Sequence, residues 1–240
     1  MRVLVTRPEP GASRTARRLA EAGHQPLLLP LSRIEPLPAQ LDALPDAVAA
    51  TSANALHNTP AELVEKLRDL PVFAVGDATA AAAAAAGFHD VRSAAGDAAA
   101  LARLVRSHTP PVSRLAWLCG RRRKPGFDEA MLAAGIAVEI VATYDVVDVE
   151  LDQALVEAVL GKAPPDTALV YSPNGARALR RLAARDEQLA RTPSILCISA
   201  DAALPLEGLF GSVTIAETPD EDAMFDRLAR LKERAEPGRV

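Results

Sequence analysis

The chain has 240 residues and a mass of 25.3 kDa, a length that suits one large or two small domains. Hydrophobic residues make up 49% and charged residues 24%, which is typical of a folded globular protein and argues against a disordered chain. The 27 Lys and Arg against 31 Asp and Glu give a net charge of −4, so a duplex nucleic-acid partner is not expected.

Short apolar runs rich in β-branched residues alternate with helical patterns along the chain, and this alternation predicts an α/β fold with parallel sheets. The predicted strands cover residues 2–6, 26–30, 46–50, 71–75, 90–94, 114–118, 137–142, 167–171, 194–199 and 212–216. The helices with the clearest spacing are predicted over 11–22, 97–106 and 219–234. The first of these ends before Gly23, because glycine favours the left-handed conformation that often follows a helix.

The N-terminal residues, the apolar stretches and the cysteines do not suggest export or a membrane. The N-terminal residues MRVLVT form a strand pattern and not a signal peptide, and the longest apolar stretch, 80–86, is alanine and far shorter than the ~20 residues that cross a bilayer. Cys119 and Cys197 lie in apolar runs, which indicates buried free thiols. These features predict a soluble cytoplasmic protein without a membrane partner.

An internal repeat relates residues 4–36 to residues 117–147. Each copy reads as a strand, a loop with arginine, a helix, an Ala-Gly stop, a second strand and an extended exit. In the same way ATSANA (50–55) resembles YSPNGA (171–176), and AVGDATAAA (74–82) resembles CISADAALP (197–205). The chain is therefore expected to contain two similar halves of about five strands each.

The repeated segments are offset along the chain, so the halves are not simply consecutive. The simplest arrangement is a discontinuous domain of residues 1–34 plus 150–240 that carries an inserted domain of residues 38–143. The chain then crosses between the domains twice, over 32–38 and 143–150. Both segments have an extended pattern, and we expect them to pair as a two-stranded hinge.

The common nucleotide-binding and catalytic fingerprints are absent from the sequence. It contains no G-x-G-x-x-G, no G-x-x-x-x-G-K-[ST], no H-E-x-x-H and no G-x-S-x-G, which argues against a nucleotide enzyme. The four histidines have no metal-ligand spacing and are expected at the surface or at helix ends. We therefore expect neither a metal nor a cofactor.

Polar residues gather instead in loops that follow strands, at the edge where open α/β sheets bind ligands. These residues are Ser52, Asn54, Gly76, Thr79, Ser172, Asn174, Gly175 and Ser199. Helix capping explains any one of these loops by itself. Four such loops, matched in pairs across two halves, favour a shared anionic ligand held by helix N-termini.

Basic residues and a rare tyrosine stand near the same edge. Arg7 follows the first strand of one repeat, and the run from Arg121 to Lys124 follows the equivalent strand of the other. A solvated loop is the alternative for the run, but its position favours contact with an anion. Tyr144 lies where the strand 137–142 enters the extended segment, so its hydroxyl is expected beside an interdomain cleft; the alternative is a tyrosine that covers an edge strand.

Together these residues resemble the uroporphyrinogen-III synthase family. The matching motifs are VTRP, TSANA, VGDATA, CGRRRKPGFDEAMLAAGIAVEIVATYDV and YSPNGA, in that family's order over essentially the whole chain. The resemblance implies two flavodoxin-like domains joined by a two-stranded β-ladder, with the active site in the cleft. It also implies cofactor-free cyclisation of hydroxymethylbilane, a linear tetrapyrrole with eight carboxylates, to uroporphyrinogen III, with loss of water and inversion of ring D through a spiro intermediate.

The resemblance also assigns roles. It makes Tyr144 the tyrosine near the leaving hydroxyl and implies substrate contacts at Arg7, Ser52, Asn54, Gly76, Thr79, Arg123, Ser172 and Gly175, to which the strand-end pattern adds Asn174 and Ser199. Two departures affect these contacts. The second copy of G-x-x-T-A reads SADAA from Ser199, without the glycine and threonine, and Ala53 replaces a proline common in the family.

The resemblance further implies a monomer that receives its substrate from hydroxymethylbilane synthase. The competing hypothesis is a non-catalytic two-domain clamshell that binds an anionic small molecule, because duplicated α/β halves about a hinge suit that role as well.

Overall fold

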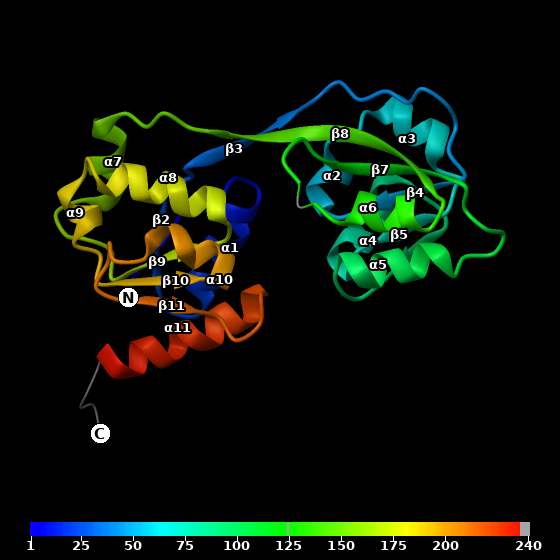
Figure 1. Cartoon of the computed structure of the whole chain (residues 1–240). Coiled ribbons are helices and arrows are strands. Elements are labelled where there is room, and N and C mark those ends of the chain that lie inside the picture. Colours follow the sequence, from blue (N-terminus) through cyan, green and yellow to red (C-terminus); the bar gives the residue numbers. More distant parts are fainter. Residues whose placement is uncertain (124, 236–240) are drawn as a thin grey trace. The chain divides into compact units, whose positions relative to one another are not determined.

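The computed structural model describes residues 1–123 and 125–235, and it divides the chain into two compact units. The first unit combines Met1–Arg33, drawn in blue in Figure 1, with Val147–Val240, drawn from yellow-green to red as far as Ala235. The second unit is Ile34–Val146.

The first unit is built on a five-stranded sheet in the order β11-β10-β9-β1-β2. All neighbours in it are parallel, as the sequence predicted. Its strands are β1 (Arg2–Val5), β2 (Gln25–Leu28), β9 (Thr167–Val170), β10 (Ser194–Cys197) and β11 (Val213–Ile215). Its helices are α1 (Gly11–Glu21), α7 (Gln153–Leu160), α8 (Pro173–Ala183), α9 (Glu187–Ala190), α10 (Ala200–Ala203), the 3-10 helix Leu204–Leu206 and α11 (Glu221–Ala235).

The second unit is built on a six-stranded sheet in the order β3-β8-β7-β4-β5-β6, parallel from β8 to β6. Its strands are β3 (Ser32–Pro36), β4 (Ala47–Ala50), β5 (Val72–Ala74), β6 (Val91–Ser93), β7 (Arg114–Gly120) and β8 (Ala137–Asp148). Its helices are α2 (Ala53–His57), α3 (Ala61–Leu67), α4 (Asp77–Ala86), α5 (Ala98–Arg106) and α6 (Phe127–Ala133).

The two sheets share one strand order when the repeated segments are matched. The repeat β1-α1-β2 corresponds to β7-α6-β8, and the strands before YSPNGA and TSANA are β9 and β4. In each unit the direction in which successive strands are added to the sheet changes at one place, which we call the reversal point. It lies between β1 and β9 in the first unit and between β7 and β4 in the second. Ligands of open α/β sheets bind at such reversal points, outside the carboxyl ends of the strands.

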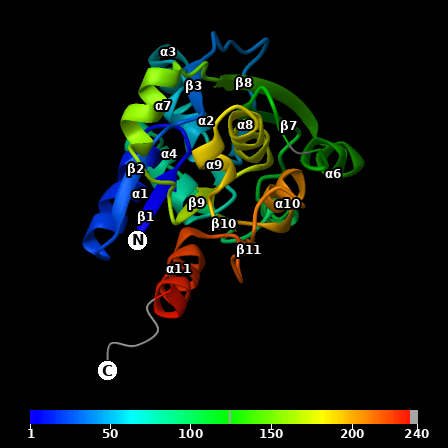
Figure 2. The same ribbon diagram turned by 90° about the vertical axis from the view of Figure 1, so that its left-hand side faces the viewer.

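Each sheet of this fold is covered by helices on both faces, which explains the nearly continuous apolar strands. In the first unit Leu4 faces the core under α7 and α8, whereas its neighbours Val3 and Val5 face the core under α1 and α11. Figure 2 looks onto this unit with α8 and α11 on opposite sides of β9 and β10. The second unit repeats the plan, with α5 and α6 on one face and α2, α3 and α4 on the other.

The extended segments that the sequence placed at 32–38 and 143–150 are mostly strand. The segment after residue 142 does not start a separate element, because β8 runs without interruption from Ala137 to Asp148. Strand β3 lies beside β8. Backbone hydrogen bonds from Leu37 to Thr143 and from Val149 to Leu31 have the register of an antiparallel pair.

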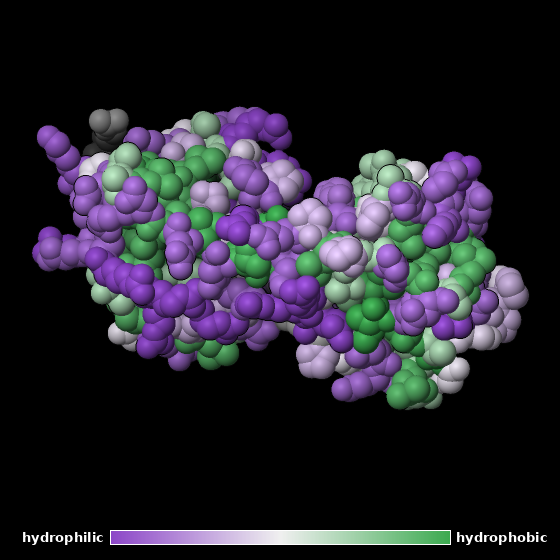
Figure 3. Space-filling model, turned by 90° about the horizontal axis from the view of Figure 1, so that it is seen from above, coloured by the Kyte–Doolittle hydropathy of each residue, from purple (hydrophilic) through white to green (hydrophobic). Residues whose placement is uncertain are grey.

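Among the described residues, no helix is both long and apolar enough to cross a bilayer. The face shown in Figure 3 is mostly hydrophilic, with hydrophobic residues between the polar ones. Both cysteines are free and buried, as the sequence predicted. One histidine differs from expectation: His24 is buried, with 9% of its surface exposed, and burial next to the N-terminal amino group and Lys232 lowers its pKa.

Candidate functional site

The loops that follow the strands lead directly into helices, as the sequence predicted. The hydroxyl oxygens of Ser52, Ser172 and Ser199 accept hydrogen bonds from backbone N–H groups at 3.2, 3.1 and 3.4 Å and so cap α2, α8 and α10. Gly76 precedes α4, and its carbonyl accepts the N–H of Thr79 at 3.0 Å. Capping therefore accounts for the residue types of these loops, and the helix N-termini remain suited to anions.

A pocket of about 290 Å³ lies at the reversal point of the second unit. It is lined by Thr51, Ser52, Val75, Ala98, Trp117, Gly120, Arg122, Arg123, Pro125, Phe127 and Tyr144. Three of the residues predicted from the sequence, Ser52, Arg123 and Tyr144, are brought together here.

Aromatic packing shapes the floor of this pocket. The rings of Trp117 and Phe127 meet edge to face with centroids 4.9 Å apart, and the Trp117 Nε1–H donates to the hydroxyl of Thr51 at 3.2 Å. Trp117 comes from β7, Phe127 begins α6, and Thr51 follows β4. The pocket therefore has an apolar base with polar groups at the strand ends, which is a common composition for a small-molecule site.

Tyr144 is half-buried on β8 and stands opposite Gly120 of β7, at an irregularity in the register of that strand pair. A Cβ atom on residue 120 would lie 2.9 Å from Cζ of Tyr144. Tyr144 could be predicted as a site residue partly because tyrosine is rare in this chain. Nothing in the sequence indicated that Gly120 leaves space for its ring.

Three arginines follow β7 and differ in how they are held. Arg121 pairs with Asp145 at 3.1 Å. Arg123 is exposed, and its guanidinium carbon lies 5.7 Å from the centre of the Trp117 ring. Arg122 is exposed, lines the pocket and forms no ion pair in the part of the chain that the structure describes. Two positive charges therefore border the pocket, while Lys124, the last residue of the predicted basic run, lies outside the described residues.

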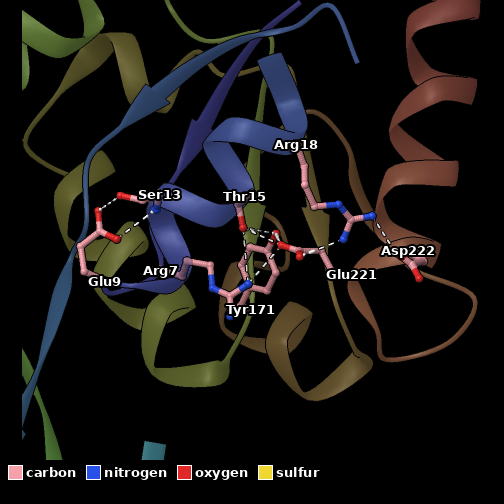
Figure 4. A network of polar contacts seen from close by, with 8 residues as sticks. All are labelled: Arg7, Glu9, Ser13, Thr15, Arg18, Tyr171, Glu221 and Asp222. Atoms are coloured by element: carbon pink, nitrogen blue, oxygen red, sulfur yellow. Dashed lines mark hydrogen bonds and ion pairs between the residues drawn. The ribbon is translucent and has the colours of Figure 1, made fainter. Parts of the chain in front are cut away.

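The reversal point of the first unit holds a network of polar contacts instead (Figure 4). Arg7 Nη1 donates to Glu221 at 3.1 Å, and its guanidinium stacks on the ring of Tyr171, 4.1 Å from the centroid. The hydroxyls of Tyr171 and Thr15 also donate to Glu221, at 2.8 and 2.5 Å. The sequence had singled out only Arg7 from this group.

The remaining predicted residues are spread along the strand ends. Asn174 accepts a hydrogen bond from Arg177, and Gly175 presents its N–H to Ser172. Asn54 and Gly76 do not line the pocket, and the side chain of Thr79 is buried in α4 with 6% of its surface exposed.

The described residues contain no group of three or more His, Cys, Asp or Glu side chains that could hold a metal ion. Two histidines instead form surface pairs, His89 with Asp69 at 2.9 Å and His108 with Arg92 at 2.8 Å.

Comparison with known proteins identifies the family of this chain. The profile of the family described as uroporphyrinogen-III synthase HemD matches residues 13–226. No curated protein matches the chain significantly. Among solved structures, the uroporphyrinogen-III synthetase of Helicobacter pylori is 19% identical, with a TM-score of 0.66 over 96% of this chain and 100% of that one.

A mutant uroporphyrinogen III synthase of the extremely thermophilic bacterium Thermus thermophilus is 18% identical, with a TM-score of 0.53 over 98% of this chain and 99% of that one. At these identities the structures establish a shared α/β fold, and the family profile, which spans most of the chain, establishes the relationship. The chain belongs to the uroporphyrinogen-III synthase HemD family, whose members are cyclising lyases of haem biosynthesis.

Proposed function

We propose that this chain converts hydroxymethylbilane to uroporphyrinogen III with the reacting end of the substrate at the pocket around Tyr144. The observation that supports this site is the meeting of one tyrosine hydroxyl, two exposed arginines and the end of a parallel sheet around a single pocket. Carboxylates of the substrate match the arginines and the helix N-termini, and its pyrrole rings match the Trp117 and Phe127 floor.

The substrate itself supplies much of the driving force. Its electron-rich terminal pyrrole expels the hydroxyl group, the carbon–oxygen bond breaks, and an azafulvene cation remains. The substituted carbon of ring D then attacks this cation to give a spiro intermediate, whose rearrangement inverts the ring before closure. The protein therefore has to hold the chain so that this carbon, and not the free one, meets the cation, which is catalysis by positioning.

Tyr144 is proposed to donate a proton to the departing hydroxide, so that water leaves. In this proposal Tyr144 needs no neighbouring base, because it acts as an acid in the first step and regains its proton when ring closure releases one. Arg122 and Arg123 are proposed to hold substrate carboxylates beside it.

Tyr144→Phe tests the proposed acid. Loss of one proton donor costs about 10²–10⁴-fold where general acid catalysis is fully used, and we expect the smaller end of that range or less, because the pyrrole already drives hydroxide out. The assay adds hydroxymethylbilane and separates isomers III and I, with thermal unfolding as the control for folding. Complete loss of turnover would mean that acid catalysis, and not positioning, dominates.

Charge removal tests the proposed carboxylate contacts. Arg122→Gln with Arg123→Gln should raise KM about 10-fold or more, because both lost contacts are charged hydrogen bonds, although exposure of the two side chains to water makes each weaker than a buried one. The matched control is Arg106→Gln, an exposed arginine of α5 that does not line the pocket. Equal KM values for both proteins would contradict the proposed role of the pair.

The clamshell alternative predicts a different product pattern. A protein that only binds the substrate leaves spontaneous closure unchanged, so isomer I would predominate at the rate observed without protein. The family relationship does not favour this alternative.

We also propose that each unit is a flavodoxin-like domain and that residues 32–38 and 143–150 act as a hinge between the domains 1–34 plus 150–240 and 38–143. The strand order of the first unit, which is 2-1-3-4-5 in chain order, supports the first part. Two chain crossings at these segments support the second. Small-angle scattering with and without uroporphyrinogen III tests the hinge, and identical profiles would contradict it.

Finally, we propose that the protein acts in the cytoplasm as a monomer that takes hydroxymethylbilane from hydroxymethylbilane synthase. The instability of the substrate, which closes spontaneously, supports direct hand-over. Light scattering on a sizing column tests the monomer. In an assay that couples hydroxymethylbilane synthase to this protein, both enzymes are diluted together and the fraction of isomer I is measured. A constant fraction would support direct hand-over. A fraction that rises as expected for free diffusion of the substrate would contradict it.

A further inference from the structure

The reversal points of the two units are filled differently although their strand orders match. In the second unit this place is the open pocket, and one of its walls is Ala98, the first residue of α5. In the first unit the helix after the last strand is α11, whose first residue is Glu221. Alanine leaves the space open, whereas the Glu221 side chain reaches across toward β1 and β9.

Glu221 is the common acceptor of this network (Figure 4). Its Oε1 atom accepts from Arg7, Thr15 and Tyr171, and its Oε2 atom accepts from Arg18 at 3.0 Å. Its side chain is 24% exposed, so most of it has left water. Four donors from three separate segments therefore converge on one carboxylate, and a carboxylate that is largely removed from water needs such partners.

Arg7 is the member of the network that the sequence assigned to the substrate. Its side chain lies over the start of α1, where a Cβ on Gly11 would lie 2.5 Å from Arg7 Nε. Only its Nη1 atom donates hydrogen bonds within the described residues, to Glu221 and weakly to Thr15. The Nε and Nη2 donors remain for a carboxylate, and the side chain is 26% exposed.

Tyr171 is fixed by the same carboxylate. Its hydroxyl donates to Glu221 while Arg7 covers its ring, and Ser172, the cap of α8, follows it directly. The network thus ties the loop after β1 to the loop after β9. Burial, together with the nearby Glu221 charge, raises the pKa of Tyr171 well above its usual range, so this hydroxyl stays protonated as a donor.

We propose that Glu221 is a positioning residue, which holds Arg7 and Tyr171 in one arrangement so that the free donors of Arg7 are preset for a substrate carboxylate. This inference rests on the proposed function, because it assumes that a polycarboxylate binds at the strand ends. Glu221 itself does not touch the substrate. Preset charged donors bind more tightly because less side-chain freedom is lost on binding.

The test uses Glu221→Ala and Glu221→Gln, with Asp222→Asn as the matched control. Asp222 is the next residue of α11 and also pairs with Arg18, but its side chain is 86% exposed and forms no contact with Arg7 or Tyr171 in the described part of the chain. Steady-state kinetics on hydroxymethylbilane, with separation of isomers III and I, and thermal unfolding are measured for each protein.

Glu221→Ala should raise KM about 10-fold and leave kcat nearly unchanged, because one charge-assisted contact loses its geometry. Glu221→Gln keeps an acceptor oxygen for Arg7, Thr15 and Tyr171 and should raise KM less. Asp222→Asn should leave both constants at the wild-type values.

Three results would overturn the proposal. A fall in kcat that parallels the loss of folded protein, at constant KM, would mean that Glu221 only stabilises the fold. A KM of Glu221→Ala below the wild-type value would mean that Glu221 competes with the substrate for Arg7. If Asp222→Asn raised KM as much as Glu221→Ala does, the loss of a negative charge in this region, and not the position of Glu221, would explain the effect. If the wild-type protein produced no isomer III, the proposed function would fail first, and that result is seen without any variant.

Discussion

The Cβ atom that Gly120 lacks would lie 2.9 Å from Cζ of Tyr144 and 3.1 Å from its hydroxyl oxygen. The two residues are register partners where β7 ends against β8. Glycine at position 120 therefore lets the tyrosine ring lie across the end of β7, beside the floor of the pocket.

Gly120→Ala should displace the Tyr144 ring and reduce kcat/KM at least as much as Tyr144→Phe does, because the ring moves as well as the hydroxyl. The overpacking should destabilise the protein by about 1–3 kcal/mol. A double-mutant cycle by urea denaturation checks the cause: in a Tyr144→Ala background the same change should cost less, since the space is free. An equal cost in both backgrounds would contradict the steric explanation.

Acidic residues at the loops proposed to bind substrate carboxylates should repel the substrate without harming the fold. Gly175→Glu and Asn54→Glu each place a carboxylate in the first turn of a helix, where it interacts favourably with the helix dipole. We therefore expect unchanged thermal unfolding, a higher KM and a larger share of isomer I. Ala61→Glu, in the exposed first turn of α3, is the control and should behave as wild type. A normal isomer ratio in both loop variants would exclude these loops from substrate binding.

Activity should withstand chelation. The reaction needs no Lewis acid in the proposed mechanism, because the leaving group is expelled by the substrate's own pyrrole. Dialysis against EDTA followed by the isomer assay should return the original rate, and added Mg²⁺ or Zn²⁺ should not change it. A rate that falls with EDTA and recovers with one of these ions would refute the cofactor-free mechanism.

Neither thiol should react in the folded protein. Burial raises the pKa of Cys119 to about 11 and that of Cys197 to about 12. At pH 8 the thiolate, which is the nucleophile, is then about one part in a thousand or less. Ellman's reagent should therefore titrate two thiols in urea and none in the native protein. Rapid native labelling of either residue would show that its strand end opens.

The contribution of Glu221 to stability should depend on pH. Burial acts to raise the pKa of this carboxyl, but the hydrogen bonds from Thr15, Tyr171 and Arg18 and the charge of Arg7 outweigh it, so the pKa lies below its usual value of 4.5. A carboxyl with a lowered pKa in the folded state stabilises the fold above its unfolded pKa, and this contribution is lost as the pH falls through the folded pKa.

The stability difference between wild type and Glu221→Gln should therefore be constant from pH 7 down to about pH 5 and should shrink below that. Urea denaturation at pH 7, 5 and 3.5 measures it. A difference that stays the same at pH 3.5 would show that the Glu221 charge contributes nothing to the fold.

The sequence by itself determined the local and repeating features of this protein. Strand runs, helix spacing and serine caps depend on residues that are near one another, so the parallel α/β sheets and the capping roles of Ser52, Ser172 and Ser199 could be predicted. The repeated segments indicated two similar halves for the same reason, because each copy carries its own pattern.

Tertiary structure alone decided which residues share a site. Arg7 and Glu221 are 214 positions apart, and Gly120 reaches Tyr144 only because β7 and β8 pair with an irregular register. Nothing in the sequence pattern distinguishes Glu221 or Ala98, which are the first residues of α11 and α5. The periodicity of a sequence records which side of an element is buried, but partners across a sheet edge are set by strand order and register, which long-range packing selects.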